Sequence, residues 1–352
     1  MEDKLKFDVK TAQKLFTKAA RIDQYKGKWQ HLAKKDNRYL NELRTLATIQ
    51  SIGSSTRIEG ATLTNAEVET LLKNMKVTKF RTRDEQEVGG YYDVLSMILE
   101  RYQHIELSVT NIKTLHNYLL KYSDKDEKHK GDYKHFTNKV VATYPDGQQR
   151  TIFNTTEPHL VDKQMDELVE WTNKELANQD FHSLFVIATC VYEFLSIHPF
   201  QDGNGRLSRL LTMLLLMREG YDFVQYISFE DIIERRKSDY YRALMAGQQK
   251  RNTEEEIIGE WMLFFLSCLE EIILKLDEKY ERHLLIGGYL NERQRNLVEF
   301  IRQQGVVSLT DIVPVFSTVS KKTLQRDLSL LESEYLIEVT GSRKSAAYRA
   351  SK

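Results

Sequence analysis

The sequence predicts a mostly α-helical protein with one β-hairpin and a separate C-terminal module. The chain has only four prolines in 352 residues, and residues that favour helices dominate its composition. Two segments, 184–197 and 207–217, are apolar almost all round, which is typical of helices at the centre of a bundle. Residues 139–144 and 149–153 favour strands and flank a turn at Pro145, Asp146 and Gly147, so they predict the hairpin.

The charge balance argues against two broad classes of protein. Lysine plus arginine number 51, as do aspartate plus glutamate, so the formal net charge is zero. Such a chain is not expected to coat nucleic acid or membranes, although a local basic patch is compatible with it. No apolar run follows the N-terminus, and the longest runs fall far short of the roughly 20 residues of a membrane span. We expect a cytoplasmic protein with no membrane partner, in which Cys190 and Cys268 are buried free thiols.

The order of these patterns predicts four regions. Residues 1–100 form an N-terminal helical region, 101–253 a core, 254–288 a connecting helix with a hinge at Gly287 and Gly288, and 289–352 the separate module. In the first region, apolar side chains are expected on one helical face at Tyr39, Leu40, Leu43, Leu46, Ala47 and Ile49.

Shorter signals place the remaining elements. Thr64 and Glu67 form a capping-box pattern that predicts the start of a helix. Further helices are expected at 105–130, from Pro158 onward and at 254–283. In the C-terminal module we expect helices at 292–303, 309–316 and 320–335, followed by two short strands around Gly341.

The segment from His198 to Arg209 connects the two apolar helices and is the most informative part of the chain. Gly203 and Gly205 bracket Asn204 just before a helix, where free backbone amides offer a seat for an anion. Arg206 and Arg209 are three residues apart, and so share one face of that helix. Cations oppose the helix dipole at this end, so an anionic ligand would explain their presence.

Two further residues of this segment predict the chemistry. Asp202 supplies a hard oxygen ligand of the kind that Mg²⁺ shares with phosphates, and the ordinary pKa of His198 suits a general base. Each residue taken singly is more often structural, but together within twelve residues they indicate phosphoryl or nucleotidyl transfer to a hydroxyl.

The same residues resemble the signature of the Fic (filamentation induced by cAMP) family, His-x-Phe-x-(Asp/Glu)-Gly-Asn-Gly-Arg-x-x-Arg, with every fixed position matched. The resemblance covers roughly residues 40 to 250. It implies a Fic-type helical bundle that transfers AMP from ATP to a Ser, Thr or Tyr hydroxyl of a protein with Mg²⁺. On this sequence it makes His198 the base and Asp202 the metal ligand, and it packs Phe200 in the core. It assigns the nucleotide's phosphates to Gly203, Asn204, Gly205, Arg206 and Arg209.

Two more segments match features of that family. The hairpin at 138–153, with Val140, Val141 and Ala142, resembles the family's flap, whose edge can pair with an extended target segment. Tyr240 resembles a family residue near the adenine. Gln248 stands where relatives often carry asparagine, and the resemblance assigns it to the ATP site as well.

A second motif resembles the family's inhibitory pattern. Ser55, Glu59 and Gly60 match (Ser/Thr)-x-x-x-Glu-(Gly/Asn), upstream of the core. The resemblance implies that Glu59 pairs with Arg209 and so prevents Arg209 from holding the γ-phosphate.

The C-terminal module resembles a winged helix-turn-helix domain. Residues 320–328 resemble its recognition helix, with Lys321, Lys322 and Arg326 on the exposed side, and Arg343 and Lys344 fall in the expected wing. These cations suit DNA phosphates, but many such modules contact proteins or form dimers instead.

Two classes of function follow from these observations. The first is an autoinhibited protein adenylyltransferase, which acts on an unidentified target protein and on itself, as a monomer or a homodimer. The second is a DNA-binding regulator whose Fic core senses a nucleotide. Within the enzyme class, removal of AMP or transfer of another nucleotide or phosphoryl group stays open, because nothing in the motif reads the base.

Overall fold

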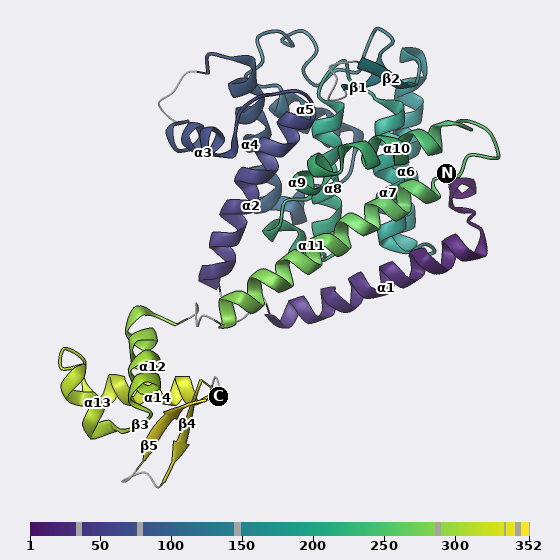
Figure 1. Ribbon diagram of the computed structural model, residues 1–352. Helices are drawn as coiled ribbons and strands as arrows, with labels where there is room; N and C mark the ends of the chain where they lie inside the picture. The colour runs from purple at the N-terminus through teal and green to yellow at the C-terminus, as the bar shows by residue number, and fades with distance from the viewer. Residues whose placement is uncertain are drawn as a thin grey trace. The chain divides into compact units, whose positions relative to one another are not determined.

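The computed structural model describes residues 1–32, 37–75, 80–143, 149–285, 290–333, 336–341 and 346–351. The chain divides into two compact units, Met1–Asp277 and Glu278–Lys352. The prediction of a mostly helical chain is confirmed (Figure 1). None of the described helices is long and apolar enough to cross a bilayer.

Most of the larger unit is a bundle of α-helices (Figure 1). Its elements in chain order are η1 (Glu2–Leu5), α1 (Val9–Leu32), α2 (Asn37–Ile58), α3 (Asn65–Asn74), α4 (Arg83–Arg101), η2 (Tyr102–His104), α5 (Val109–Leu119), β1 (Lys139–Thr143), β2 (Gln149–Asn154), α6 (Pro158–Asn178), α7 (Ser183–Ile197), α8 (Asn204–Arg218), η3 (Asp222–Tyr226), α9 (Phe229–Arg235), α10 (Lys237–Gln248) and α11 (Gly259–Leu285). The last residues of α11, from Glu278 on, belong to the smaller unit.

The two apolar helices lie at the centre of this bundle, as the sequence predicts. Every residue of α7 from Leu184 to Ile197 and of α8 from Leu207 to Met217 is buried. Cys190 and Cys268 are buried and free, as expected. On the outside, α1 runs along α11 and is tied to it by ion pairs from Lys18 to Glu270 and from Lys28 to Asp277 (Figure 1). The loop between α7 and α8 is therefore held between two buried helices.

Helix starts follow their local signals. Thr64 and Glu67 form the expected capping box at the start of α3, and Pro158 opens α6. The helix expected at 105–130 is shorter, because the Ser108 hydroxyl caps its start and the polar residues after Leu119 form turns.

Two expectations about helices are wrong in detail. Leu46 is 53% exposed, because the buried stripe of α2 follows Leu40, Leu43 and Ala47 and leaves Leu46 at its edge. The helix expected from residue 254 begins at Gly259 instead. The buried Glu256 carboxylate accepts from the Asn252 backbone N–H, which holds the preceding residues in a loop.

The predicted hairpin is present as an antiparallel pair of strands. Val140 pairs with Phe153 and Val141 with Thr151, and the register shifts between Val140 and Val141. The turn at 144–148 lies outside the described residues, as do the side chains of Val141 and Ala142.

The smaller unit contains helices and a three-stranded antiparallel sheet of order β3-β5-β4. Its elements are α12 (Glu292–Gln304), β3 (Val306–Ser308), α13 (Leu309–Val315), α14 (Lys321–Ser333), β4 (Ile337–Thr340) and β5 (Ala347–Ala350). It has a hydrophobic core of its own around Leu297, Ile301 and Leu328. The hinge at Gly287 and Gly288 and the wing cations Arg343 and Lys344 lie outside the described residues.

Candidate active site

The loop between α7 and α8 reverses the chain through two left-handed residues. His198 ends α7 with φ of 53°, and Gly203 precedes α8 with φ of 82°. The Asn204 side chain holds the loop closed, since its Oδ1 accepts from the Phe200 N–H at 2.9 Å and its Nδ2 donates to the Phe200 carbonyl at 2.7 Å. Phe200 is fully buried, as the sequence predicts. Asn204 thus shapes the loop, because both polar atoms of its side chain are used within it.

A buried histidine that the sequence analysis did not single out supports this loop from α5. The His116 ring stacks on Phe200 with 3.7 Å between ring centres and 7° between planes. Its Nδ1 accepts from the Gly131 N–H at 3.0 Å, so its Nε2 carries the proton and donates to the Asp202 carbonyl at 2.9 Å. Burial lowers the pKa of His116 to about 4, so the ring stays neutral and the tautomer is fixed.

His198 is held in the form that a general base requires. Its Nδ1 lies 3.2 Å from the Leu195 carbonyl oxygen, which can only accept, so Nδ1 carries the proton and the lone pair is on Nε2. Burial lowers the pKa of His198 to about 4, and the nearby charge of Lys134 acts in the same direction. The imidazole is therefore neutral at pH 7.

A cavity of about 200 Å³ joins His198 to the start of α8. The hairpin contributes Val140 and Phe153, and α10 contributes Tyr240, Tyr241 and Leu244. The other residues lining this cavity are Glu59, Lys139, Leu195, Gln201, Asp202, Gly203, Asn204, Gly205 and Arg206. The structure thus brings most of the expected site residues to one place. Gln248 instead donates to the Tyr192 hydroxyl at 2.9 Å and the Ser196 hydroxyl at 2.6 Å, so its contact with a nucleotide stays a prediction.

Asp202 lies between two guanidinium groups. Its Oδ1 accepts from the Gly203 N–H at 2.6 Å and from Arg206 at 3.1 Å, and its Oδ2 accepts from Arg83 at 3.1 Å. Burial acts to raise the pKa of Asp202, but Arg206, the Gly203 N–H and Arg83 outweigh it, and the pKa lies below its ordinary value. Asp202 is therefore a carboxylate at neutral pH.

Arg206 is 1% exposed and lies within 3.3 Å of the Glu87 carboxylate. Its buried Nε has no hydrogen-bond acceptor among the described residues. A buried donor without an acceptor is costly unless a ligand satisfies it. An anion at the start of α8 would do so.

Arg209 is held by the segment that the sequence marks as inhibitory. Its Nε donates to the Ser55 hydroxyl at 2.8 Å, and its Nη2 donates to the Ser55 carbonyl at 2.9 Å and to Glu59 Oε1 at 2.8 Å. The Arg209 side chain is 3% exposed and that of Glu59 35%. The predicted pair between Glu59 and Arg209 is therefore present in the geometry.

The Glu59 carboxylate also lies against the first turn of α8. A Cβ added to Gly205 would meet Glu59 Oε1 at 2.2 Å, so only glycine permits this approach. Gly60 turns the chain away with φ of 109°. The end of α2 is anchored next to it, because Lys237 donates to the Ile58 carbonyl at 2.8 Å. A carboxylate thus lies where the helix start would attract an anion.

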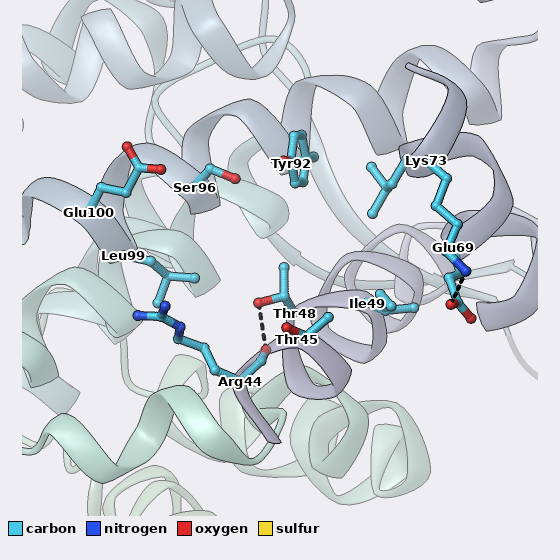
Figure 2. A pocket seen from close by; sticks show the side chains of 11 residues that line it. Arg44, Thr45, Thr48, Ile49, Glu69, Lys73, Tyr92, Ser96, Leu99 and Glu100 are labelled. Carbon is cyan, nitrogen blue, oxygen red and sulfur yellow. Dashed lines mark hydrogen bonds and ion pairs between the residues drawn. The ribbon is translucent and has the colours of Figure 1, made fainter. Parts of the chain in front are cut away.

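A larger cavity, of about 390 Å³, lies between α2, α3 and α4, away from the motif (Figure 2). Figure 2 shows Arg44 and Glu100 at one end, Tyr92 in the middle, and Lys73 paired with Glu69 at 2.6 Å at the other end. Its described lining contains no histidine or cysteine. The smaller cavity at His198 is the candidate active site, because a neutral base and a helix start converge there.

Comparison with known protein families finds a match that includes this loop. Residues 106–216 match the model of the Fic/DOC family. This segment is therefore similar to the Fic/DOC domain. Residues 293–341 match the model of the DeoR-like helix-turn-helix domain, which agrees with the winged-helix fold expected for the smaller unit.

Curated relatives of this chain include two fly proteins named protein adenylyltransferase Fic. The protein of Drosophila grimshawi is 29% identical over 239 residues, which are 67% of this chain and 44% of that protein. The protein of Drosophila melanogaster is 28% identical over 241 residues, 68% of this chain and 44% of that protein. The match thus spans less than half the length of these relatives.

Solved structures share the fold of this chain. A Fic family protein from Desulfovibrio desulfuricans has a TM-score of 0.63 at 22% identity and covers 98% of this chain and 97% of its own. A Fic domain containing signaling protein from Bacteroides thetaiotaomicron has a TM-score of 0.59 at 24% identity, over 72% of this chain and 94% of its own. At these identities the likeness concerns the fold alone.

Proposed function

We propose that this Fic chain is an autoinhibited protein adenylyltransferase, which transfers AMP from ATP to a protein hydroxyl. The observation that carries the proposal is the cavity in which the neutral His198 and the start of α8 converge. The relatives named protein adenylyltransferase Fic support the choice of reaction and of nucleotide.

The residues of the cavity have complementary roles in this reaction. The backbone amides of Asn204 and Gly205 and the guanidinium of Arg206 bind the phosphates. The Gly203 N–H donates to Asp202 Oδ1 and so orients that carboxylate beside them. Nε2 of His198 accepts the proton of the target hydroxyl as its oxygen attacks the α-phosphorus. The bond from the α-phosphorus to the bridging oxygen then breaks, and pyrophosphate leaves. AMP stays on the target as a phosphodiester.

The residues at the start of α8 also fit a magnesium ion. Mg²⁺ is usually bound by one or two carboxylates, with phosphate oxygens and waters completing its shell. Asp202 is an ionised carboxylate beside the phosphate seat, although Arg206 and Arg83 now occupy its oxygens. No group of three or more acidic, histidine or cysteine side chains suited to a metal occurs in the described part of the chain, so such an ion would depend on the nucleotide for its other ligands. When bound, it would neutralise charge on the phosphates.

Glu59 restrains the reaction in this proposal. The pair between Glu59 and Arg209 occupies a guanidinium that would otherwise bind the γ-phosphate. The Glu59 carboxylate also repels the triphosphate from the start of α8, because it lies against Gly205.

The hairpin would present the target. Val140 of β1 and Phe153 of β2 line the cavity, so an extended segment paired along β1 would bring its hydroxyl toward His198. Adenine would contact α10, where Tyr240 and Tyr241 line the same cavity.

Two preparations of labelled ATP distinguish this reaction from its alternatives. We expect label in the α-phosphate to remain on protein after denaturation, whereas label in the γ-phosphate does not. Retention of γ-label would instead indicate phosphoryl transfer. If the Glu59→Gly chain retains neither label, the result would contradict transfer and favour a nucleotide sensor.

DNA binding by the smaller unit is the second candidate function. Lys321, Lys322 and Arg326 are exposed on α14, and the match to the DeoR-like helix-turn-helix model includes this helix. We expect the full chain to shift duplex DNA in a gel at low salt and to lose this binding steeply as salt rises. Replacement of the three cations by alanine should abolish the shift. If the wild-type chain and the variant shift the DNA to the same extent, α14 does not bind DNA and serves protein contact or dimerisation instead.

A further inference from the structure

Lys134 is a buried cation that the reaction above does not use. It is 3% exposed, and all three of its ammonium protons are donated to uncharged acceptors. The distances from Nζ are 2.9 Å to Asn138 Oδ1, 2.7 Å to Thr155 Oγ1 and 3.1 Å to the Ile197 carbonyl oxygen. A buried ammonium without a contacting carboxylate is expensive to maintain, and burial lowers the pKa of Lys134 to about 8.

The three acceptors belong to the two parts of the site that must meet during transfer. Asn138 directly precedes β1 and Thr155 directly follows β2, so they lie side by side at the open end of the hairpin. Ile197 directly precedes the base, His198. One ammonium group therefore connects the residues that flank both strands of the hairpin to the start of the loop that carries His198.

Neighbouring bonds strengthen the same junction. The Lys134 backbone N–H donates to the Pro199 carbonyl at 2.8 Å, and Asn138 Nδ2 donates to the Phe200 carbonyl at 2.9 Å. The Thr155 hydroxyl in turn lies 3.0 Å from the Asn138 carbonyl. Gly203 and Arg206 of the proposed phosphate seat take no part in these bonds. The junction and the seat share one acceptor, the Phe200 carbonyl, to which the Asn204 side chain also donates.

We infer that Lys134 is a positioning residue, which fixes the hairpin and the segment it presents in register with Nε2 of His198. This inference rests on the proposed transfer to a segment paired with the hairpin. The Lys134 ammonium contacts both ends of the hairpin and the carbonyl next to His198. Its loss would therefore shift the hairpin and His198 relative to each other. A displacement of about 1 Å at a reacting atom can cost about 10²-fold in rate.

The test uses the full chain carrying Glu59→Gly, with itself as acceptor. Lys134→Met removes the three donors and keeps much of the volume, and Lys134→Arg keeps the charge and several donors. Lys128→Met, at an exposed lysine nearby, is the matched control. For each variant, the automodification rate, the ATP dissociation constant and the hydrogen exchange of the amides in 139–143 and 149–154 are measured.

In Lys134→Met we expect automodification to fall about 10- to 100-fold and the hairpin amides to exchange faster, while ATP binding changes less than about twofold. Lys134→Arg should recover part of the rate, and Lys128→Met should match its parent. Equal losses of ATP binding and transfer, without recovery in Lys134→Arg, would reduce Lys134 to a structural residue and overturn the inference. Unchanged exchange of the hairpin amides would also overturn it, even if no variant transfers AMP. Absence of transfer from the Glu59→Gly parent itself contradicts the proposed function instead.

Discussion

Replacing Glu59 with glycine is expected to raise automodification by about 10²- to 10³-fold, the usual worth of one well-placed donor at a transition state. Arg209 is almost fully buried and now donates to Glu59 and Ser55. Without the carboxylate, one of its donors becomes available to the nucleotide, and the negative charge against Gly205 is removed. Incorporation of α-labelled ATP into the wild-type chain and the variant measures the effect.

The control separates the charge of Glu59 from the backbone freedom that glycine adds. Glu59→Gln keeps the length of the side chain but cannot form the ion pair, so it should also activate, to a smaller degree. If both variants incorporate as much label as wild type, Glu59 has no inhibitory role and the ion pair is only structural.

Replacing His198 with alanine in the activated chain is expected to lower transfer by about 10²- to 10⁴-fold, the usual contribution of a general base. The neutral imidazole is the base of the proposed reaction, and burial keeps it neutral by lowering its pKa to about 4. ATP binding should persist, because the phosphates are bound by the start of α8 and by arginines. Titration calorimetry with ATP and label transfer, run on the same variant, distinguish these two effects.

His104, an exposed histidine at the end of η2, supplies the matched control. His104→Ala should transfer at the rate of its parent. Transfer by His198→Ala at that same rate would mean that another group removes the proton, and the assignment of the base would fail.

The sequence predicts the centre of this protein well because strong local signals agree there. The apolar runs at 184–197 and 207–217 identify the two central helices, and the motif between them identifies the loop and predicts its chemistry. The inhibitory motif is equally informative, because Ser55 and Glu59 both contact Arg209 in the structure. In these segments composition, spacing and resemblance point to the same arrangement.

The residues that the sequence analysis missed act through distant contacts. His116, Lys134 and Arg83 lie on segments far along the chain from the motif, and nothing in their neighbouring residues signals a role. Each becomes informative only through burial or pairing, such as the stack of His116 on Phe200. A lone histidine or lysine in a sequence is only a weak signal of a role at a site, because most such residues are structural.

Errors at the edges of elements have local causes. Periodicity places Leu46 on the apolar face of α2, but it lies at the edge of that face and is half exposed. The β3 strand of three residues was not predicted, because it is too short to show alternation and pairs with β5 some forty residues later. The start of α11 depends on the buried Glu256, whose bond to Asn252 the sequence does not reveal.

The central claim is that the loop from His198 to Arg209 transfers AMP to a protein hydroxyl under the restraint of Glu59. Intact-mass spectrometry of the full Glu59→Gly chain after incubation with ATP and Mg²⁺ tests it most directly. We expect added mass equal to one or more AMP groups, and we expect none when His198→Ala is introduced as well. An unmodified mass in the Glu59→Gly chain, or the same adduct with and without His198, would contradict it.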